Sequence, residues 1–199
     1  PVNNDIFLIK DLYKTKKQLI LSFGARSHNE ILKLKKLYKK NLNNLKRIAF
    51  LHCVSNYPLN PINSNLSYIN KLKTIFRGSK IGYSSHEGEI YNSILSLSKK
   101  IDFIERHVTI DKDMIGLDHS SSSDLNEIKK LNFYCKNYEK ILFSNNLKTL
   151  NQGELINLQN LGKSYVYKKN LKINQRLKKK YLVETYNNTS NLLTIENLI

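Results

Sequence analysis

Short apolar runs alternate with segments of helical periodicity along most of this chain. The runs recur at intervals of roughly thirty residues, the size of a strand–helix–strand unit. Continuous apolar strands that are covered by helices indicate a parallel sheet. Four such units can form half of a (β/α)8 barrel or part of an open doubly wound sheet. The apolar runs cover residues 18–24, 47–55, 80–86 and 101–109.

Each segment that follows an apolar run has apolar residues at helical spacing. The first begins with Ser27, which can cap a helix, and Glu30 three positions later completes a capping-box pattern. Comparable stripes occupy residues 63–76, 88–100 and 120–142. We therefore expect one helix after each strand.

Polar side chains occur at the carboxyl end of every apolar run. In parallel barrels these ends meet at one rim, where catalytic residues from several strands gather. Their recurrence at the same end of four runs therefore favours the barrel over the open sheet. The side chains are Ser22, His52, Ser55, Ser84, His86, Glu105 and His107.

Two of these side chains are histidines that end neighbouring strands, His86 and His107. Glu105 lies two residues before His107, so both can face the barrel mouth, and Asp118 follows in the next loop. Two imidazoles from adjacent strands can hold Mn²⁺ or Zn²⁺, with water or substrate oxygen atoms completing the shell. Alternatively, each histidine is a rim residue that is hydrogen-bonded to the backbone. The residues alone leave both interpretations open.

His52 and Cys53 form a third candidate for chemistry. A Cys–His nucleophilic pair needs two converging side chains, whereas adjacent strand residues point to opposite faces. The sequence therefore disfavours cysteine catalysis, and we expect Cys53 to be buried and His52 to line the mouth or orient a neighbouring residue. Asp111 and Asp113 match only part of a calcium-loop pattern, so we interpret them as turn residues.

The formal net charge of +17 suggests, taken alone, a nucleic acid or another anionic partner. Only five of the 33 basic residues are Arg, the residue that makes forked contacts to phosphates and bases. Nucleic-acid binding is therefore the least favoured hypothesis, and we expect no nucleic-acid partner. That hypothesis predicts an affinity that falls steeply with salt.

Several features bear on the cellular compartment. No apolar run approaches the length of a membrane span, and the first residues lack a signal-peptide pattern. The two cysteines, Cys53 and Cys135, are too few for a disulfide scaffold. We therefore expect a reduced, cytoplasmic protein without a membrane partner.

The pattern of the chain changes near Leu150, after which no clean helical stripe continues beyond the first turn. Two short segments, SYVYKK and YLVETY, have the composition of strands. We therefore predict half a barrel in residues 1–145, a linker in residues 146–162, and the beginning of a small β-rich domain in residues 163–199.

Four segments together resemble the sialic acid synthase family, whose members join phosphoenolpyruvate to an N-acyl amino sugar. They are LSFGA (21–25), HCVSNYP (52–58), IGYSSH (81–86) and IERHVTIDKDMIGLDHSSS (104–122). The family patterns are close to LSTGM, HCVSNYP, GYSDH and IEKHFTLD…GPDHKAS. The tail GKSYVYKKNLKINQ is similar to the segment where the family's barrel gives way to its antifreeze-like C-terminal (SAF) domain.

The resemblance implies a (β/α)8 TIM barrel of which this chain contains the last four strands, followed by the start of the antifreeze-like domain. It implies a cytoplasmic transferase that forms a nonulosonic acid and releases phosphate, and a homodimer in the full-length form. The first half of the barrel, with groups that clamp both substrates, is missing from this chain. We therefore expect the chain to be a fragment that is inactive unless another chain supplies those strands.

The resemblance also implies roles for individual residues. His86 and His107 correspond to the two protein ligands of a divalent metal, usually Mn²⁺, with Mg²⁺ or Co²⁺ as alternatives. Glu105 corresponds to the acidic residue near the reacting centre. The remaining correspondences are Ser22, Ser55 and Ser84 with phosphoenolpyruvate, and Tyr57 and Asp118 with the sugar.

This chain departs from the family patterns at three positions. Ser85 replaces an Asp that we expect to support the metal site, and Phe23 replaces a Thr that we expect near the phosphate. Arg106 replaces a Lys, a change that we interpret as benign. The first two replacements favour an alternative hypothesis, in which the chain is a non-catalytic descendant or partner subunit of the same fold.

Overall fold

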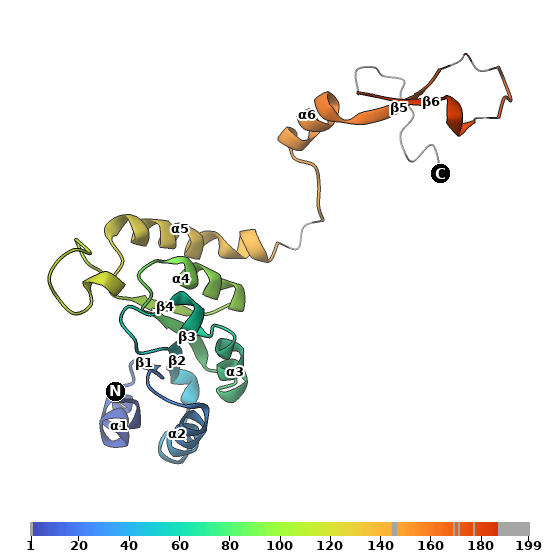
Figure 1. Cartoon of the computed structure of the whole chain (residues 1–199). Coiled ribbons are helices and arrows are strands. Elements are labelled where there is room, and N and C mark those ends of the chain that lie inside the picture. Colours follow the sequence, from blue (N-terminus) through green and yellow to red (C-terminus); the bar gives the residue numbers. More distant parts are fainter. Residues whose placement is uncertain (1, 145–146, 169, 171, 177, 187–199) are drawn as a thin grey trace. The chain divides into compact units, whose positions relative to one another are not determined.

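A computed structural model of the chain divides into two compact units, Pro1–Ser144 and Asn145–Ile199 (Figure 1). Among the described residues, no helix is both long enough and apolar enough to cross a membrane. The structure describes residues 2–144, 147–168, 170, 172–176 and 178–186.

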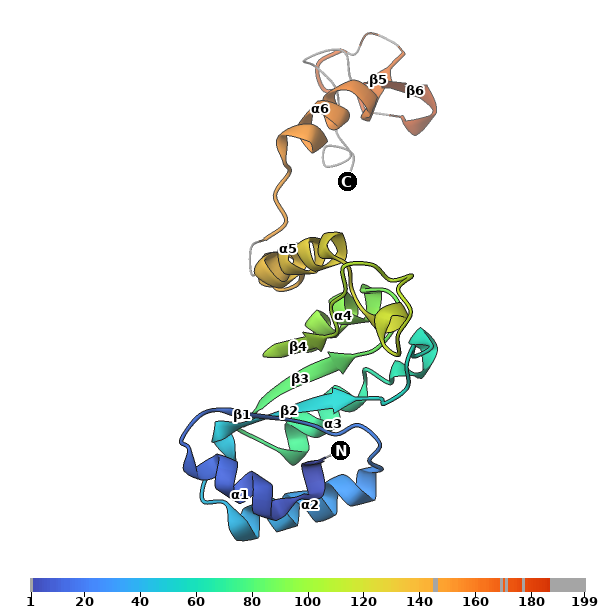
Figure 2. The ribbon, with the colours of Figure 1, turned by 90° about the vertical axis from the view of Figure 1, so that its left-hand side faces the viewer.

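The first unit is built on a four-stranded sheet in which every neighbouring pair of strands is parallel. The strand order is the sequence order, as Figure 2 shows. A doubly wound sheet reverses its order at a switch point, whereas a barrel proceeds in one direction, so this order is that of half a barrel. The strands are β1 (Leu19–Ser22), β2 (Ile48–Cys53), β3 (Lys80–Ser85) and β4 (Phe103–Arg106).

A helix follows each strand, as the periodicity predicts. The predicted capping box is present at the first of these helices, where Ser27 and Glu30 satisfy each other's backbone N–H groups. A second capping box, Asp124 with Glu127, begins the last. The helices are α2 (His28–Asn41), α3 (Tyr68–Ile75), α4 (Tyr91–Ser96) and α5 (Leu125–Leu142).

Helix α1 (Ile6–Lys14) precedes the first strand and was not predicted. Asp5 caps it by accepting a hydrogen bond from the backbone N–H of Leu8 at 3.0 Å, and Ile9 is fully buried. Phe7, however, is 79% exposed. The apolar residues of α1 nevertheless have a helical spacing as clear as that of α2, so the signal for this helix was present in the sequence.

Stacked aromatic rings form the centre of the core, between β2 and the helices. The ring centroid of Phe50 lies 3.9 Å from that of Phe76, 5.5 Å from that of Phe23 and 6.0 Å from that of Tyr38. All four side chains are buried. Such rings contribute large buried areas, so this cluster is the main hydrophobic anchor of the sheet.

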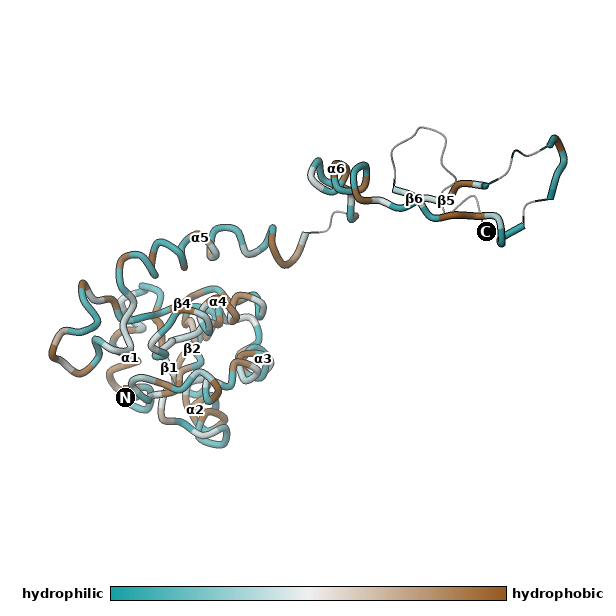
Figure 3. The backbone as a smooth tube through the Cα atoms, turned by 45° about the horizontal axis from the view of Figure 1, so that its top comes forward, coloured by the Kyte–Doolittle hydropathy of each residue, from teal (hydrophilic) through white to brown (hydrophobic). Residues whose placement is uncertain are grey.

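The second unit contains helix α6 (Gln152–Leu161) and an antiparallel pair of strands, β5 (Lys163–Tyr167) and β6 (Leu182–Tyr186). The predicted linker therefore includes a helix, which Asn151 caps. Figure 3 shows hydrophilic and hydrophobic residues mixed around α6, and this mixture explains the missing stripe. Residues 187–199 of the predicted β-rich domain lie outside the described residues, and the domain boundaries stay a prediction.

His52 in β2 is a buried histidine that makes the fold sensitive to acid. Its side chain is 6% exposed in a strand that is buried throughout, and its Nε2–H donates to the Ser64 carbonyl at 2.7 Å. Burial lowers the pKa of His52 below its ordinary value of 6.5. The unfolded chain therefore binds more protons than the folded protein as the pH falls from 6.5 through the folded-state pKa, and the folded state loses stability in that window.

We expect His52→Gln to reduce this acid-dependent loss, since Gln offers a donor to Ser64 without titrating. The measurement is the free energy of unfolding in urea at about pH 7.5 and about pH 5, for wild type and variant. Leu72→Ala is the control, because loss of a buried core side chain lowers stability at both pH values. An equal acid-dependent loss in wild type and His52→Gln would contradict the prediction.

Candidate functional site

A cavity of about 320 Å³ lies where the carboxyl ends of the four strands meet. The register explains the convergence, because Cys53 pairs with Ser84 across β2 and β3, and Ser84 pairs with Glu105 across β3 and β4. Seven of the eight predicted site residues line this cavity: Ser22, Ser55, Tyr57, Ser84, His86, Glu105 and His107.

The two histidine rings face each other across the cavity, with their centroids 5.4 Å apart. The Nδ1 atom of His86 lies 3.2 Å from the Val54 carbonyl oxygen. A carbonyl only accepts, so Nδ1 carries the proton and Nε2 keeps a lone pair. Burial lowers the pKa of His86, and the nearby His107 lowers it further. The neutral imidazole that results is the form that binds metals.

The eighth predicted residue, Asp118, reaches the cavity through His107. Its Oδ2 lies 3.7 Å from His107 Nδ1, and both side chains are partly exposed. Tyr57 closes the other side, with its ring centroid 4.3 Å from that of His86 and 5.9 Å from that of His107. The structure therefore brings both histidines, the tyrosine and the aspartate into one cluster.

The Ser84 hydroxyl on β3 and the Glu105 carboxylate on β4 are in direct contact. Ser84 donates a hydrogen bond from Oγ to Glu105 Oε1 at 2.8 Å, and both residues line the cavity. This contact orients one carboxylate oxygen and leaves Oε2 available to other partners in the cavity.

The donor set fits a divalent metal that takes part of its coordination from outside the protein. The described residues contain no group of three or more His, Cys, Asp or Glu side chains placed to hold a metal ion. His86 and His107 place two imidazole rings at this cavity, and imidazole is a common ligand of divalent transition metals such as Zn²⁺, while oxygen ligands suit Mn²⁺. Water or substrate oxygen atoms would complete such a shell.

Gly24 allows the loops after β1 and β2 to approach each other closely. A Cβ atom at this position would overlap Ser55 Oγ and lie 2.9 Å from Cys53 Sγ. The absence of a side chain therefore brings Ser55 into the same cavity as Ser22. Burial raises the pKa of the Cys53 thiol, which keeps it protonated and unreactive.

Two expectations about strand residues need correction. His52 does not line this cavity; it packs against Tyr68 on the helix side, with ring centroids 5.6 Å apart, and lines a neighbouring cavity. Phe23 does not approach the central cavity either, because its ring is buried in the aromatic core. In both cases the next residue, Cys53 or Gly24, faces the cavity instead, as the alternation along a strand requires.

Ser85, which replaces an Asp expected to support the metal site, lies in a polar network beside the cavity. Its side chain is fully buried and donates to Glu87 Oε2, while Ser93 and Arg106 donate to its Oγ at 2.9 and 2.7 Å. The side chain of Ser84, one position earlier, faces the cavity. Ser85 therefore belongs to a polar network outside the cavity and not to the lining around the histidines.

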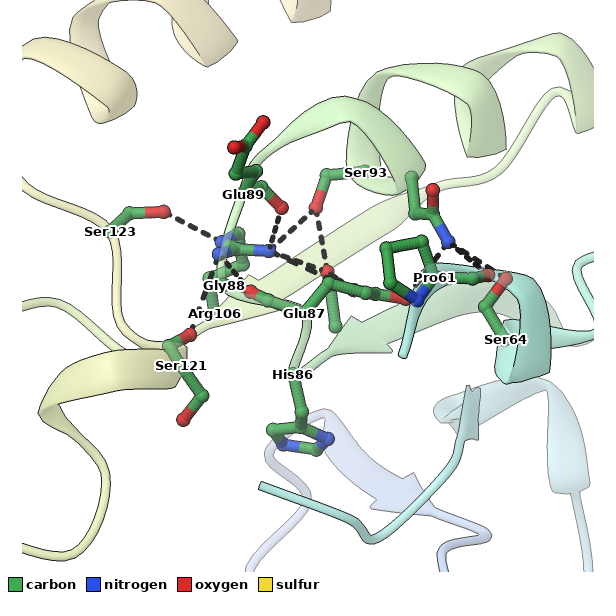
Figure 4. A network of polar contacts seen from close by, with 12 residues as sticks. Pro61, Ser64, His86, Glu87, Gly88, Glu89, Ser93, Arg106, Ser121 and Ser123 are labelled. Carbon is green, nitrogen blue, oxygen red and sulfur yellow. Dashed lines mark hydrogen bonds and ion pairs between the residues drawn. The ribbon is translucent and has the colours of Figure 1, made fainter. Parts of the chain in front are cut away.

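The sequence reasoning missed three buried polar residues at or near the site. Asn3 lines the cavity and donates from Nδ2 to the Ser22 carbonyl at 3.0 Å. The side chains of Glu87 and Arg106 are buried, and Figure 4 shows them together with His86. The available signal was their position directly next to His86 and His107 in the sequence, because a charge in a buried segment needs a partner.

Comparisons with known proteins agree with this geometry. The profile of the NeuB family matches residues 2–146. N,N'-diacetyllegionaminic acid synthase of Campylobacter jejuni is 33% identical over 165 residues, which are 82% of this chain and 48% of that protein. N-acetylneuraminate-9-phosphate synthase of Mus musculus is 34% identical over 168 residues, which are 83% of this chain and 45% of that protein.

A solved structure shows the same fold. The N-acetylneuraminic acid (sialic acid) synthetase of Leptospira borgpetersenii, crystallised with citrate, superposes with a TM-score of 0.64 at 31% identity. The match covers 79% of this chain and 54% of the solved chain. This chain thus spans about half the length of the relatives that it matches.

Proposed function

The chain belongs to the NeuB family, the family of the sialic and legionaminic acid synthases, and from this premise we propose that it forms half of a nonulosonic acid synthase. The observation that carries the proposal is the cavity at the strand ends, which gathers seven of the eight predicted site residues. The proposed reaction joins phosphoenolpyruvate to an N-acyl amino sugar such as N-acetylmannosamine.

The proposed reaction forms one carbon–carbon bond and breaks one carbon–oxygen bond. The enol carbon of phosphoenolpyruvate attacks the aldehyde carbon of the open-chain sugar, whose oxygen becomes a hydroxyl after taking up a proton. A water molecule adds to the cationic C2 carbon and loses a proton. Phosphate then leaves from C2 with its bridging oxygen while the new C2 hydroxyl loses its proton to the departing phosphate or to solvent, so that the product carries a keto group.

His86 and His107 are proposed as the protein ligands of a divalent metal, Mn²⁺ in the first instance. Such a metal acts as a Lewis acid on a carbonyl oxygen. Both side chains line the same cavity, with their ring centroids 5.4 Å apart. The Val54 carbonyl fixes the ring of His86 through Nδ1, an arrangement that orients metal ligands in many sites.

The remaining residues are proposed to bind and orient the substrates. Ser22 and Ser55 offer hydroxyl donors to phosphoenolpyruvate at the strand ends, and Ser84, whose O–H is donated to Glu105, is proposed to line the same site. Tyr57 and Asp118 lie beside the histidines, where the sugar is proposed to bind. Glu105 is proposed to exchange a proton near the reacting carbon. Positioning of this kind supplies a large part of the rate acceleration in such reactions.

We expect Glu105→Gln to lower kcat by about 100-fold or more, the usual scale of proton-transfer catalysis. Gln keeps an oxygen that accepts from Ser84 Oγ, so the fold should be retained. The measurement is steady-state phosphate release by the assembled enzyme. Glu89→Gln removes the same charge from an exposed side chain and should leave kcat unchanged; equal effects of the two variants would exclude this role for Glu105.

One of the two replacements that favoured the non-catalytic alternative, Phe23, lies in the aromatic core and outside the cavity lining. The other, Ser85, also lies outside the lining but belongs to the polar network beside it. The lining that remains includes both histidines and Glu105. A catalytic role is therefore the better supported proposal.

The decisive experiment supplies the missing strands. The chain is co-expressed with the N-terminal half of a NeuB-family barrel, and the assembled protein is assayed for phosphate release from phosphoenolpyruvate with Mn²⁺ and several N-acyl amino sugars. We expect release that depends on both substrates. A folded assembly that releases no phosphate with any of the sugars would contradict the proposal.

A further inference from the structure

A network of buried polar side chains lies next to the cavity but outside its lining (Figure 4). Its two charged members are Glu87 and Arg106, whose side chains are 1% and 2% exposed. Each follows or precedes a site histidine directly in the sequence, His86 and His107 respectively. Buried charges are costly unless they are paired and hydrogen-bonded, so their partners define what the network holds together.

Arg106 spans two loops with its guanidinium group. Nη2 donates to the Glu87 carbonyl at 2.8 Å and Nη1 to the Glu89 carbonyl at 3.1 Å, both in the turn after β3. Nε donates to Ser123 Oγ at 2.7 Å and Nη2 to the Ser121 carbonyl at 3.4 Å, both in the loop after β4. One side chain therefore fastens the turn that carries His86 to the loop that carries Asp118.

Glu87 extends the network toward the loop after β2. Its Oε1 accepts from the hydroxyl of Tyr83 and from Asn92 Nδ2, the latter at 3.2 Å, and its Oε2 lies 3.9 Å from Arg106 Nη1. Asn92 donates in turn to the Pro61 carbonyl at 2.8 Å. The network thus connects the three loops that follow β2, β3 and β4.

The charged side chains of this network do not line the cavity in which the reaction is proposed to occur. Glu105 and His107 line the cavity, whereas Arg106 between them does not, as alternation along a strand requires. A change in the network therefore leaves the cavity lining intact and alters only how its residues are placed.

We propose that the buried Glu87–Arg106 pair is a positioning device that fixes the separation and orientation of the His86 and His107 rings. The proposal rests on the proposed function in so far as the two histidines act together. The planar fork of Arg is needed, because it donates in several fixed directions at once, whereas a Lys ammonium is a single centre. Arg106, where the family pattern has Lys, then helps to place the two site histidines, so this replacement is not a benign change.

Hydrogen–deuterium exchange of the full chain tests the positioning directly and needs no metal. We compare Glu87→Gln with Glu89→Gln, which removes the same charge two positions away on an exposed side chain. In Glu87→Gln we expect exchange to accelerate about 10-fold or more in residues 86–93 and 118–123, with α2 unchanged. Exchange equal to wild type in those segments would overturn the proposal.

Two further variants separate positioning from general loss of folding. Arg106→Lys keeps the charge, and we expect it to show the same local acceleration as Glu87→Gln; wild-type exchange in this variant would overturn the role of the fork. Ser123→Ala removes one acceptor of Arg106 Nε and remains informative if the charge variants fail to fold. We expect its acceleration to be confined to residues 118–123, and no acceleration there would count against the network.

Titration with CoCl₂, followed by visible absorption, connects the network to the metal centre. We expect Glu87→Gln to weaken Co²⁺ binding by about 10- to 100-fold, the usual effect of losing a group that supports metal ligands, and Glu89→Gln to leave it unchanged. Equal affinities of wild type and Glu87→Gln would overturn the positioning role. A wild-type chain that binds no Co²⁺ would contradict the metal centre of the proposed function, and the exchange experiment then decides the positioning proposal alone.

Discussion

Replacement of His107 by Ala should abolish metal binding and lower the rate of phosphate release by at least about 1,000-fold. The described residues offer two imidazoles and no third His, Cys, Asp or Glu grouped with them as a ligand, so the loss of one removes half of the protein's donors. A bound divalent metal is worth several kcal/mol of charge stabilisation in reactions of this kind. His86→Ala should have the same effect.

Both variants are measured by Mn²⁺ binding to the chain and by activity of the assembled enzyme. His28→Ala is the matched control, because His28 is exposed and lies at the start of α2, outside the central cavity. We expect wild-type Mn²⁺ affinity in this control. Retention of Mn²⁺ binding in both site variants would show that the metal, if used, is held elsewhere.

Replacement of Phe50 by Ala should destabilise the first unit by about 3–5 kcal/mol, the usual cost of deleting a buried aromatic ring. Phe50 is fully buried and contacts three other rings, those of Phe23, Tyr38 and Phe76. Domains of this size are stable by about 5–15 kcal/mol, so the variant should be close to unfolding.

Urea unfolding followed by circular dichroism measures this effect. Phe7→Ala is the control, because Phe7 is 79% exposed on α1 and its loss should change the free energy of unfolding by less than about 1 kcal/mol. A similar small change in both variants would mean that the aromatic cluster is not the anchor of the sheet.

The strands and most helices of the first unit could be predicted from local patterns. Strand β2 is apolar except at His52 and is buried along its whole length, and the capping box at Ser27 marks the beginning of α2 within one residue. These signals are local, because burial of a strand or a helical stripe leaves its period in the sequence. Helix α6 has no such stripe, because its apolar residues are exposed around the helix, whereas the stripe of α1 was present in the sequence and went unpredicted.

The rule that polar residues gather at the carboxyl ends of parallel strands was enough to predict that residues far apart in sequence share one site. Ser22 and His107 are far apart in sequence and line the same cavity. The same rule, applied without the alternation of side chains, assigned wrong places to His52 and Phe23. Adjacent strand residues face opposite sides, so Cys53 and not His52 faces the cavity.

The Glu87–Arg106 pair could not be predicted from local sequence patterns. The chain has 33 basic residues, and the position of Arg106 next to His107 in a predicted strand sets it apart without identifying its partners. Burial of this guanidinium depends on the turn after β3 and the loop after β4 closing over it from two directions. The identity and spacing of residues were therefore sufficient to predict the strands, the cavity and its histidines. The partners of a buried charge, in contrast, depend on how the loops fold in three dimensions.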